Sequence, residues 1–79
     1  MKKSLYLTMK EKLLRSAETC NSYAKNHRPL PNYQSYGACV AYKDIIEELE
    51  HDVKFVFYSD ENGYMLIKHI IIDGETVIK

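Results

Sequence analysis

The sequence predicts an α+β fold in which two helices pack on one face of a three-stranded antiparallel β-meander. Apolar residues recur at steps of three and four through most of the first 50 positions, which is the period of an amphipathic helix. After position 52, short runs rich in Val, Ile, Phe and Tyr are separated by Asn62-Gly63 and Asp73-Gly74, dipeptides typical of tight hairpin turns. At 79 residues, 46% of them hydrophobic, the chain is expected to form one domain over residues 1–79.

The first helix is predicted to end by Arg28, because a residue that precedes proline disfavours helical geometry. Two residues are candidates for its N-cap: Ser4, which precedes all the apolar positions, and Thr8, which begins a capping-box pattern with Glu11. The apolar positions share one narrow arc of the helix and therefore predict a buried stripe. They are Tyr6, Met9, Leu13, Ala17, Cys20, Ala24 and His27.

The second helix is predicted from Tyr36 to His51, with Ser35 as its N-cap. The segment before it, residues 29–35, is expected to be an extended linker, since it contains two prolines and shows no periodicity. Acidic residues line the outside of this helix. Its buried stripe is Ala38, Cys39, Tyr42, Ile45, Ile46 and Leu49.

The register of the three strands depends on the length of the two turns between them. If the first turn has two residues, Phe57 pairs with Lys68. If the second turn also has two residues, Ile70 pairs with Val77. The same turns pair Phe55 with Ile70, Ile72 with Glu75 and Ile71 with Thr76.

Strand alternation divides the apolar residues between both faces of this sheet. The face expected to lie against the helices carries Val53, Phe55, Phe57, Ile70 and Ile72. The opposite face is expected to carry Val56, Tyr58, Met65, Ile67 and Ile71. A sheet covered on one side normally alternates apolar and polar residues, so a second apolar face predicts a partner. We expect a homodimer, a separate protein target, or both.

Tyr33 and Tyr36 join the candidate partner-binding residues. The chain contains seven tyrosines and no tryptophan, and these two lie close together in the sequence. Tyrosine offers a large, rigid contact area with a polar tip, which is typical of protein interfaces. The alternative, that both residues pack against their own fold, stays open.

Charge is unevenly distributed, although the formal net charge is zero. Residues 1–28 hold seven basic and two acidic residues, a net of +5, and residues 29–52 hold one basic and five acidic residues, a net of −4. The basic side chains of the first helix spread over most of its polar circumference, whereas a surface that follows phosphates would gather them. We therefore expect no nucleic-acid partner.

No motif for catalysis, metal binding or cofactor binding is found. The three histidines and two cysteines lack the close spacings of metal ligands, so neither a metal nor a cofactor is expected. Cys20 and Cys39 fall on the two buried stripes, where reduced thiols are expected, with a disulfide between the helices as the alternative. No apolar run approaches the roughly 20 residues of a membrane span, so we expect a cytoplasmic protein without a membrane partner.

These features predict a non-enzymatic protein-interaction module, a small regulator or inhibitor of the kind that phages and mobile elements encode. One alternative requires a short strand at Ser4–Leu7, which would join the sheet edge. The resulting order, β-α-α-β-β-β, resembles the ribosome-dependent ribonuclease toxins of toxin–antitoxin pairs. That resemblance implies basic and aromatic functional residues on the sheet, for which Tyr58, Lys68 and His69 are the candidates. A structural homodimer is the third interpretation.

Overall fold

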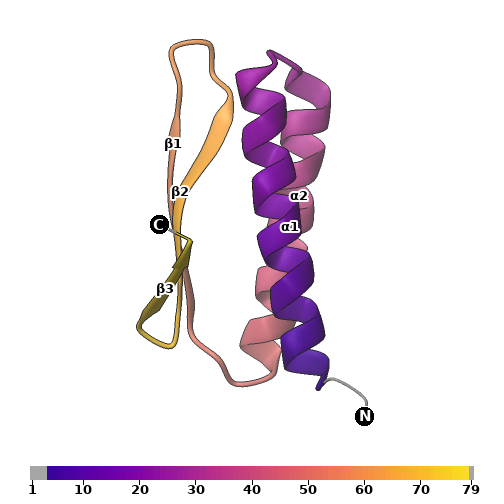
Figure 1. Cartoon of the computed structure of the whole chain (residues 1–79), viewed down its shortest axis with the longest axis vertical. Coiled ribbons are helices and arrows are strands. Elements are labelled where there is room, and N and C mark those ends of the chain that lie inside the picture. The colour runs from indigo at the N-terminus through magenta and orange to yellow at the C-terminus, as the bar shows by residue number, and fades with distance from the viewer. Residues whose placement is uncertain (1–3, 79) are drawn as a thin grey trace.

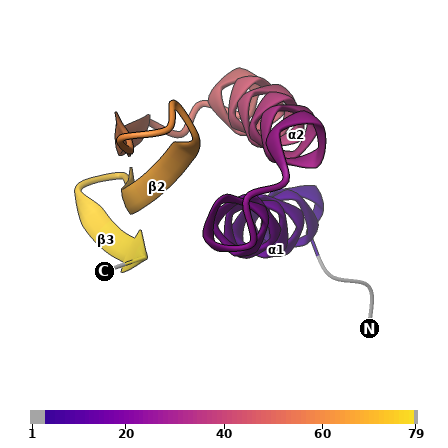
Figure 2. The same ribbon diagram turned by 90° about the horizontal axis from the view of Figure 1, so that it is seen from above.

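The computed structural model describes residues 4–78. Two helices form one layer and a three-stranded antiparallel sheet, in the order β1-β2-β3, forms the other (Figures 1 and 2). The predicted α+β class is therefore confirmed. The elements are α1 (Leu5–Lys25), α2 (Pro29–Glu48), β1 (Val53–Ser59), β2 (Met65–Ile72) and β3 (Glu75–Ile78).

Helix α1 begins where the earlier of its two candidate caps predicts. The Ser4 side-chain oxygen accepts a hydrogen bond from the Leu7 N–H at 3.2 Å, which satisfies one of the free donors of the first turn. Thr8 is an ordinary residue inside the helix, and its N–H donates to the Ser4 carbonyl at 3.1 Å. Leu5–Leu7 are helical, so the alternative of an N-terminal strand is wrong.

Helix α2 begins seven residues earlier than predicted. The segment expected as a linker, residues 29–35, is helical from Pro29 onward, and Ser35 lies inside the helix. The first N–H groups of any helix lack a partner within the helix, so prolines at the first and third positions remove no hydrogen bond there. The ladder begins at Asn32, whose N–H donates to the Arg28 carbonyl at 3.0 Å. The prolines therefore start this helix instead of delaying it.

The core lies between the two layers and uses the predicted stripe of α1, except that His27 is exposed and lies beyond the end of α1, so its place on the buried stripe is wrong. The buried cluster comprises Leu13, Ala17, Cys39, Ile46, Val53, Ile67, Ile70 and Ile72. Cys20 and Cys39 are both buried and free, so the disulfide alternative is not adopted. Burial, with the nearby Cys20 thiol, raises the pKa of Cys39 to about 12, which keeps it protonated. Ile45 is 40% exposed, so its placement on the buried stripe of α2 is wrong.

The first hairpin has a longer turn than predicted. The Asp60 carboxylate accepts hydrogen bonds from the N–H groups of Asn62 and Tyr64, at 2.9 and 3.0 Å, and so fixes a loop from Asp60 to Tyr64. Phe57 consequently pairs with Ile67 and not with Lys68. The register returns to the predicted pairing of Phe55 with Ile70. Lys68 is thus an extra residue, a β-bulge on β2.

The second hairpin has the predicted two-residue turn, with Asp73 and Gly74 both at positive φ, 51° and 83°. Ile72 pairs with Glu75 and Ile71 with Thr76, as predicted. Ile70, however, pairs with Ile78, which leaves Val77 as an extra residue on β3.

The bulge at Lys68 reverses which side chains of the first half of β2 face the helices, because a one-residue shift exchanges the two faces of a strand. Ile67 is 3% exposed and belongs to the core. Met65 pairs with Ser59, on the same side of the sheet. The prediction that Met65 and Ile67 lie on the uncovered face is therefore wrong.

Candidate protein-interaction surface

The face of the sheet that points away from the helices is built from three cross-strand pairs (Figure 2). We call it the outer face. Val56 and Tyr58 are 41% and 51% exposed on it, while Leu66 and Ile71 are half-buried. The pairs are Lys54 with Ile71, Val56 with His69 and Tyr58 with Leu66. Four of its six residues are apolar or aromatic, and Lys54 and His69 are its polar members, with His69 in the middle pair.

The middle of β1 is open on both of its sides. Val56, Phe57 and Tyr58 are consecutive, and they are 41%, 47% and 51% exposed. Because successive residues of a strand point to opposite faces, three exposed apolar neighbours mean that neither face of the strand is fully covered here. Among the described ring pairs, Phe57 belongs to one, a T-shaped contact with Tyr36 in which the ring centroids lie 5.6 Å apart. We call Val56, Phe57 and Tyr58 the β1 triplet.

Two asparagines from the helices bond to the edge of β2 that faces away from β1. Strand β3 pairs only with Ile70–Ile72, so the first half of β2 needs other partners on that side. The Asn21 side chain donates to the Ile67 carbonyl at 2.9 Å and accepts from the Ile67 N–H at 2.8 Å. Asn32 does the same for Met65, with both distances 2.9 Å. Each side-chain amide therefore acts as a short piece of neighbouring strand.

Asn32 is the buried member of this pair, with 0% exposure. Its amide nitrogen also donates to the Cys20 carbonyl at 2.9 Å, so both the amide nitrogen and the amide oxygen are satisfied. The sequence pattern singled out neither asparagine as a functional residue. Asn21 lies next to the apolar stripe of α1. Asn32 lies in the segment predicted to be a linker, and a prediction of helix for residues 29–35 would have pointed to Asn32.

The two candidate tyrosines lie apart from the outer face. The Tyr33 hydroxyl donates to the Gly63 carbonyl at 2.9 Å and ties the hairpin tip to α2, although 52% of the residue stays exposed. Tyr36 is half-buried and packs on the core beside Phe57. Of the seven predicted partner-binding residues, the structure brings three together on the outer face: Val56, Tyr58 and Ile71.

A second contact holds the other end of the sheet. The His51 Nδ1 lies 2.6 Å from the Asp73 Oδ2, and the Asp73 Oδ1 accepts from the Asp52 N–H at 2.8 Å. The hydrogen bond with His51 lowers the pKa of Asp73, and the Asp52 N–H adds to that effect. Tyr6 stacks on the His51 ring with centroids 3.8 Å apart. This cluster joins the β2–β3 turn to the start of α1 and explains His51 structurally.

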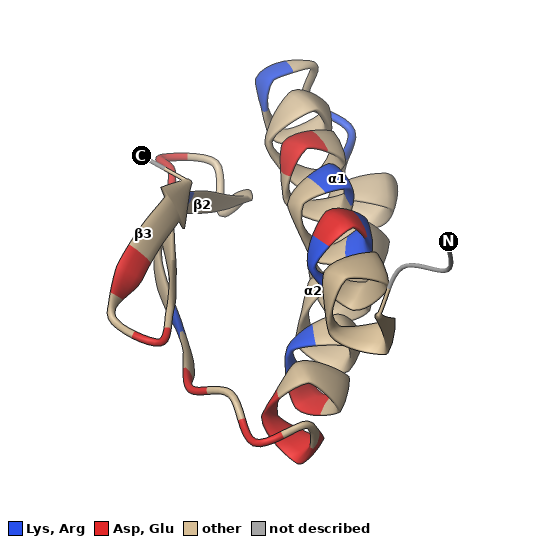
Figure 3. Cartoon of the chain, turned by 60° about the horizontal axis from the view of Figure 1, so that its bottom comes forward, with Lys and Arg blue, Asp and Glu red and all other residues tan. Residues whose placement is uncertain are grey.

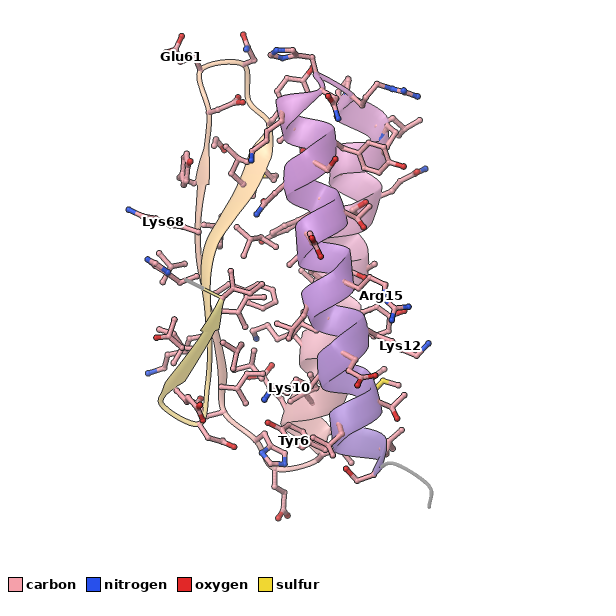
Figure 4. All side chains as sticks on the ribbon, in the orientation of Figure 1. Tyr6, Lys10, Lys12, Arg15, Glu61 and Lys68 are labelled. Atoms are coloured by element: carbon pink, nitrogen blue, oxygen red, sulfur yellow. The ribbon has the colours of Figure 1, made fainter. Side chains whose placement is uncertain are left out.

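Charged side chains do not gather on one surface. Figure 3 shows acidic residues where α2 leads into β1, whereas lysines and arginines are scattered over both the helices and the sheet. Lys12 and Arg15 point away from the sheet, while Lys68 points away from the helices on the far side of the molecule (Figure 4). The predicted charge of +5 also includes Lys2 and Lys3, which lie outside the described residues.

Two surface hollows lie away from the outer face. One, of about 370 Å³, is lined by Asp44, Ile45, Glu48 and Leu49. The other, of about 280 Å³, is lined by Leu14, Glu18, Asn21 and Ile78. Neither set contains a nucleophile beside a base, the arrangement that covalent catalysis requires.

Over residues 4–78, no group of three or more His, Cys, Asp or Glu side chains is placed to hold a metal ion. None of the described helices combines the length and hydropathy needed to cross a bilayer. Comparisons with protein-family models, with curated proteins and with solved structures found no match to this chain.

Proposed function

We propose that this chain is a non-enzymatic protein-interaction module, a small regulator or inhibitor that binds a protein through the outer face and the β1 triplet. The observation that supports it is the exposure of three consecutive apolar residues on an edge strand. Contiguous apolar surface on a folded domain commonly marks a binding site. A strand edge adds main-chain donors and acceptors to that surface, as in binding by strand addition.

The chemistry of the surface supports a protein partner over nucleic acid. Lys54 shares the outer face with Val56 and Tyr58, and Lys68 also points away from the helices, whereas Lys12 and Arg15 lie on the other side of the molecule (Figure 4), so the basic groups are divided between two sides. Phosphate binding needs basic groups that act together. A mostly apolar surface with an exposed aromatic residue is instead the composition of a protein-binding hot spot.

Photo-crosslinking in cells tests this proposal. A benzophenone amino acid replaces Tyr58 in one version of the chain and Arg15, which faces away from the sheet, in the other. We expect a discrete protein adduct from position 58 after irradiation and none from position 15. Equal adduct patterns from both positions, or none from position 58, would contradict the proposal.

The ribonuclease alternative required an N-terminal strand, which the structure does not form. An assay of RNA cleavage by the purified protein tests the catalytic part of this alternative. We expect no cleavage of RNA, with or without ribosomes. Cleavage that His69→Ala abolishes would overturn the non-enzymatic assignment.

A further inference from the structure

We propose that the partner is a second copy of this chain, paired with the first through β1 in antiparallel register about a two-fold axis at Val56. This inference rests on the proposed function and names its partner. The product would be one continuous six-stranded sheet, with each half contributing the three strands of one chain.

The first argument is that β1 has few of the devices that keep strand edges from pairing. Such devices include prolines, bulges, inward-pointing charges and covering elements. β1 is seven residues long, with the sequence VKFVFYS, and Lys54 is its one charged residue. Both extra residues of the sheet, Lys68 and Val77, fall on the other two strands. Figure 2 shows both helices on one side of the sheet, with β1 at its edge.

The second argument concerns the direction of backbone groups. Met65 and Ile67 direct their N–H and C=O groups to the two asparagines, away from β1. Antiparallel ladders alternate, so Leu66 directs its groups to its β1 partner, Tyr58. By the same alternation, Phe55 and Phe57 present their N–H and C=O groups at the open edge of β1. A neighbouring strand would bond to these two residues.

The third argument is that β1 complements itself. With the axis at Val56, Phe55 lies opposite Phe57 of the second copy on the inner side of the sheet, an aromatic pair. Lys54 lies opposite Tyr58 of the second copy on the outer face, so no like charges meet within β1, although Asp52 and Asp60, just beyond its two ends, lie opposite each other. All seven residues of β1 have a counterpart in the second copy. Because the chain's net charge is zero, no long-range repulsion opposes association.

Neighbouring registers are less favourable. Moving the axis to Phe57 would place Lys54 opposite Asp60, and the Asp60 carboxylate already accepts two N–H groups in the hairpin turn. That register would also leave Val53 without a counterpart within β1. The axis at Val56 is the one that uses the whole strand.

Cysteine crosslinking tests the register directly. At Val56 the two copies would form a pair without main-chain hydrogen bonds, with Cα atoms about 4.5 Å apart, which is within disulfide range. We expect Val56→Cys to form a covalent dimer with oxidised glutathione, because each cysteine would meet its own copy. Lys54→Cys is the matched control on the same face, and it should form little dimer, since Tyr58 of the second copy lies opposite. The native Cys20 and Cys39 are buried in both variants.

Light scattering after size exclusion, at about 1–100 μM chain, measures the unmodified assembly. We expect a mass of twice 9.2 kDa for the wild type. Val56→Asp should give a monomer with unchanged helical circular dichroism, because it brings two carboxylates together at the axis. Arg15→Asp, on the side of α1 that points away from the sheet, is the control and should leave the dimer intact, whereas Leu66→Asp tests for contacts through the outer face on β2.

The outcomes separate the two proposals. A monomeric wild type that still gives an adduct with another protein from position 58 would overturn the homodimer and leave the interaction module standing. A monomeric wild type with no adduct would overturn both. A dimer that survives Val56→Asp but is lost in Leu66→Asp would show face-to-face packing and overturn the pairing through β1.

Discussion

Replacing Asn32 with alanine should be among the most destabilising single changes in this domain. Asn32 is fully buried and bonds three backbone groups: the N–H and C=O of Met65 and the C=O of Cys20. Each buried group left without a partner costs about 1–3 kcal/mol. Met65 is half-buried, so water would replace part of what is lost there. We therefore expect the free energy of unfolding to fall by about 2–4 kcal/mol.

That loss is large for a chain of this size. At about 0.05–0.15 kcal/mol per residue, the whole domain is stable by roughly 4–12 kcal/mol. Urea unfolding followed by circular dichroism measures the change. Asn21→Ala removes two bonds at a half-buried site and should cost about 1 kcal/mol. Asn26→Ala, at an exposed position, is the control and should stay within about 0.5 kcal/mol of the wild type.

The isosteric change Asn32→Asp separates hydrogen bonding from volume. The carboxylate can still accept from the Met65 N–H, but it cannot donate to the two carbonyls, and it buries a charge. We expect it to cost at least as much as Asn32→Ala. If Asn32→Ala remained as stable as Asn26→Ala, the idea that asparagine amides close this side of the sheet would be wrong.

Three further changes test the core, the ion pair and the thiols. Leu13→Ala should lower the free energy of unfolding by about 2–5 kcal/mol, whereas Ile45→Ala, at a 40% exposed position, should cost less than about 1 kcal/mol; thermal melts compare the two. Because the pKa of Asp73 is lowered in the folded state, its contribution to stability is present above the ordinary aspartate pKa of about 3.9 and is lost as the pH falls through the lower folded value. Urea midpoints measured between about pH 5 and pH 2 should therefore fall less in Asp73→Asn than in the wild type. Parallel curves for the two proteins would contradict this. Since the pKa of Cys39 is about 12 and the thiol is buried, a disulfide reagent at about pH 8 should label it only after denaturant is added, and rapid labelling of the native protein would place it at the surface.

The fold class could be predicted because it depends on periodicities that persist over many residues. The stripe of α1 recurs from Tyr6 to Ala24, so an error at any one position leaves the prediction intact. The start of α2 depends instead on the position of two prolines relative to the first turn. Proline is as compatible with the first turn of a helix as with a linker, and composition alone does not separate them.

The candidate surface was only partly predictable, and the reason is a single side chain. Strand alternation carries a prediction correctly until a bulge shifts it by one residue. The Asp60 carboxylate accepts hydrogen bonds from two N–H groups of the hairpin, and the turn is therefore longer than two residues. Lys68 forms a bulge that restores the predicted register in the rest of the strand pair. Val56 and Tyr58 lie on the unbulged strand and were placed correctly, whereas Met65 and Ile67 lie beyond the bulge and were not.

The two edges of the sheet are treated in opposite ways, and this contrast bears on function. On one side, β3 and two amide side chains satisfy the main chain of β2, at the expense of burying a polar residue in a small core. On the other side, the edge strand carries Val56, Phe57 and Tyr58 where a single charged residue would hinder pairing. A domain that had only to stay folded would gain solubility from such a charge at little expense in stability. An edge strand left apolar, in a chain that satisfies the far side of β2 with β3 and two asparagine amides, is what a pairing surface requires.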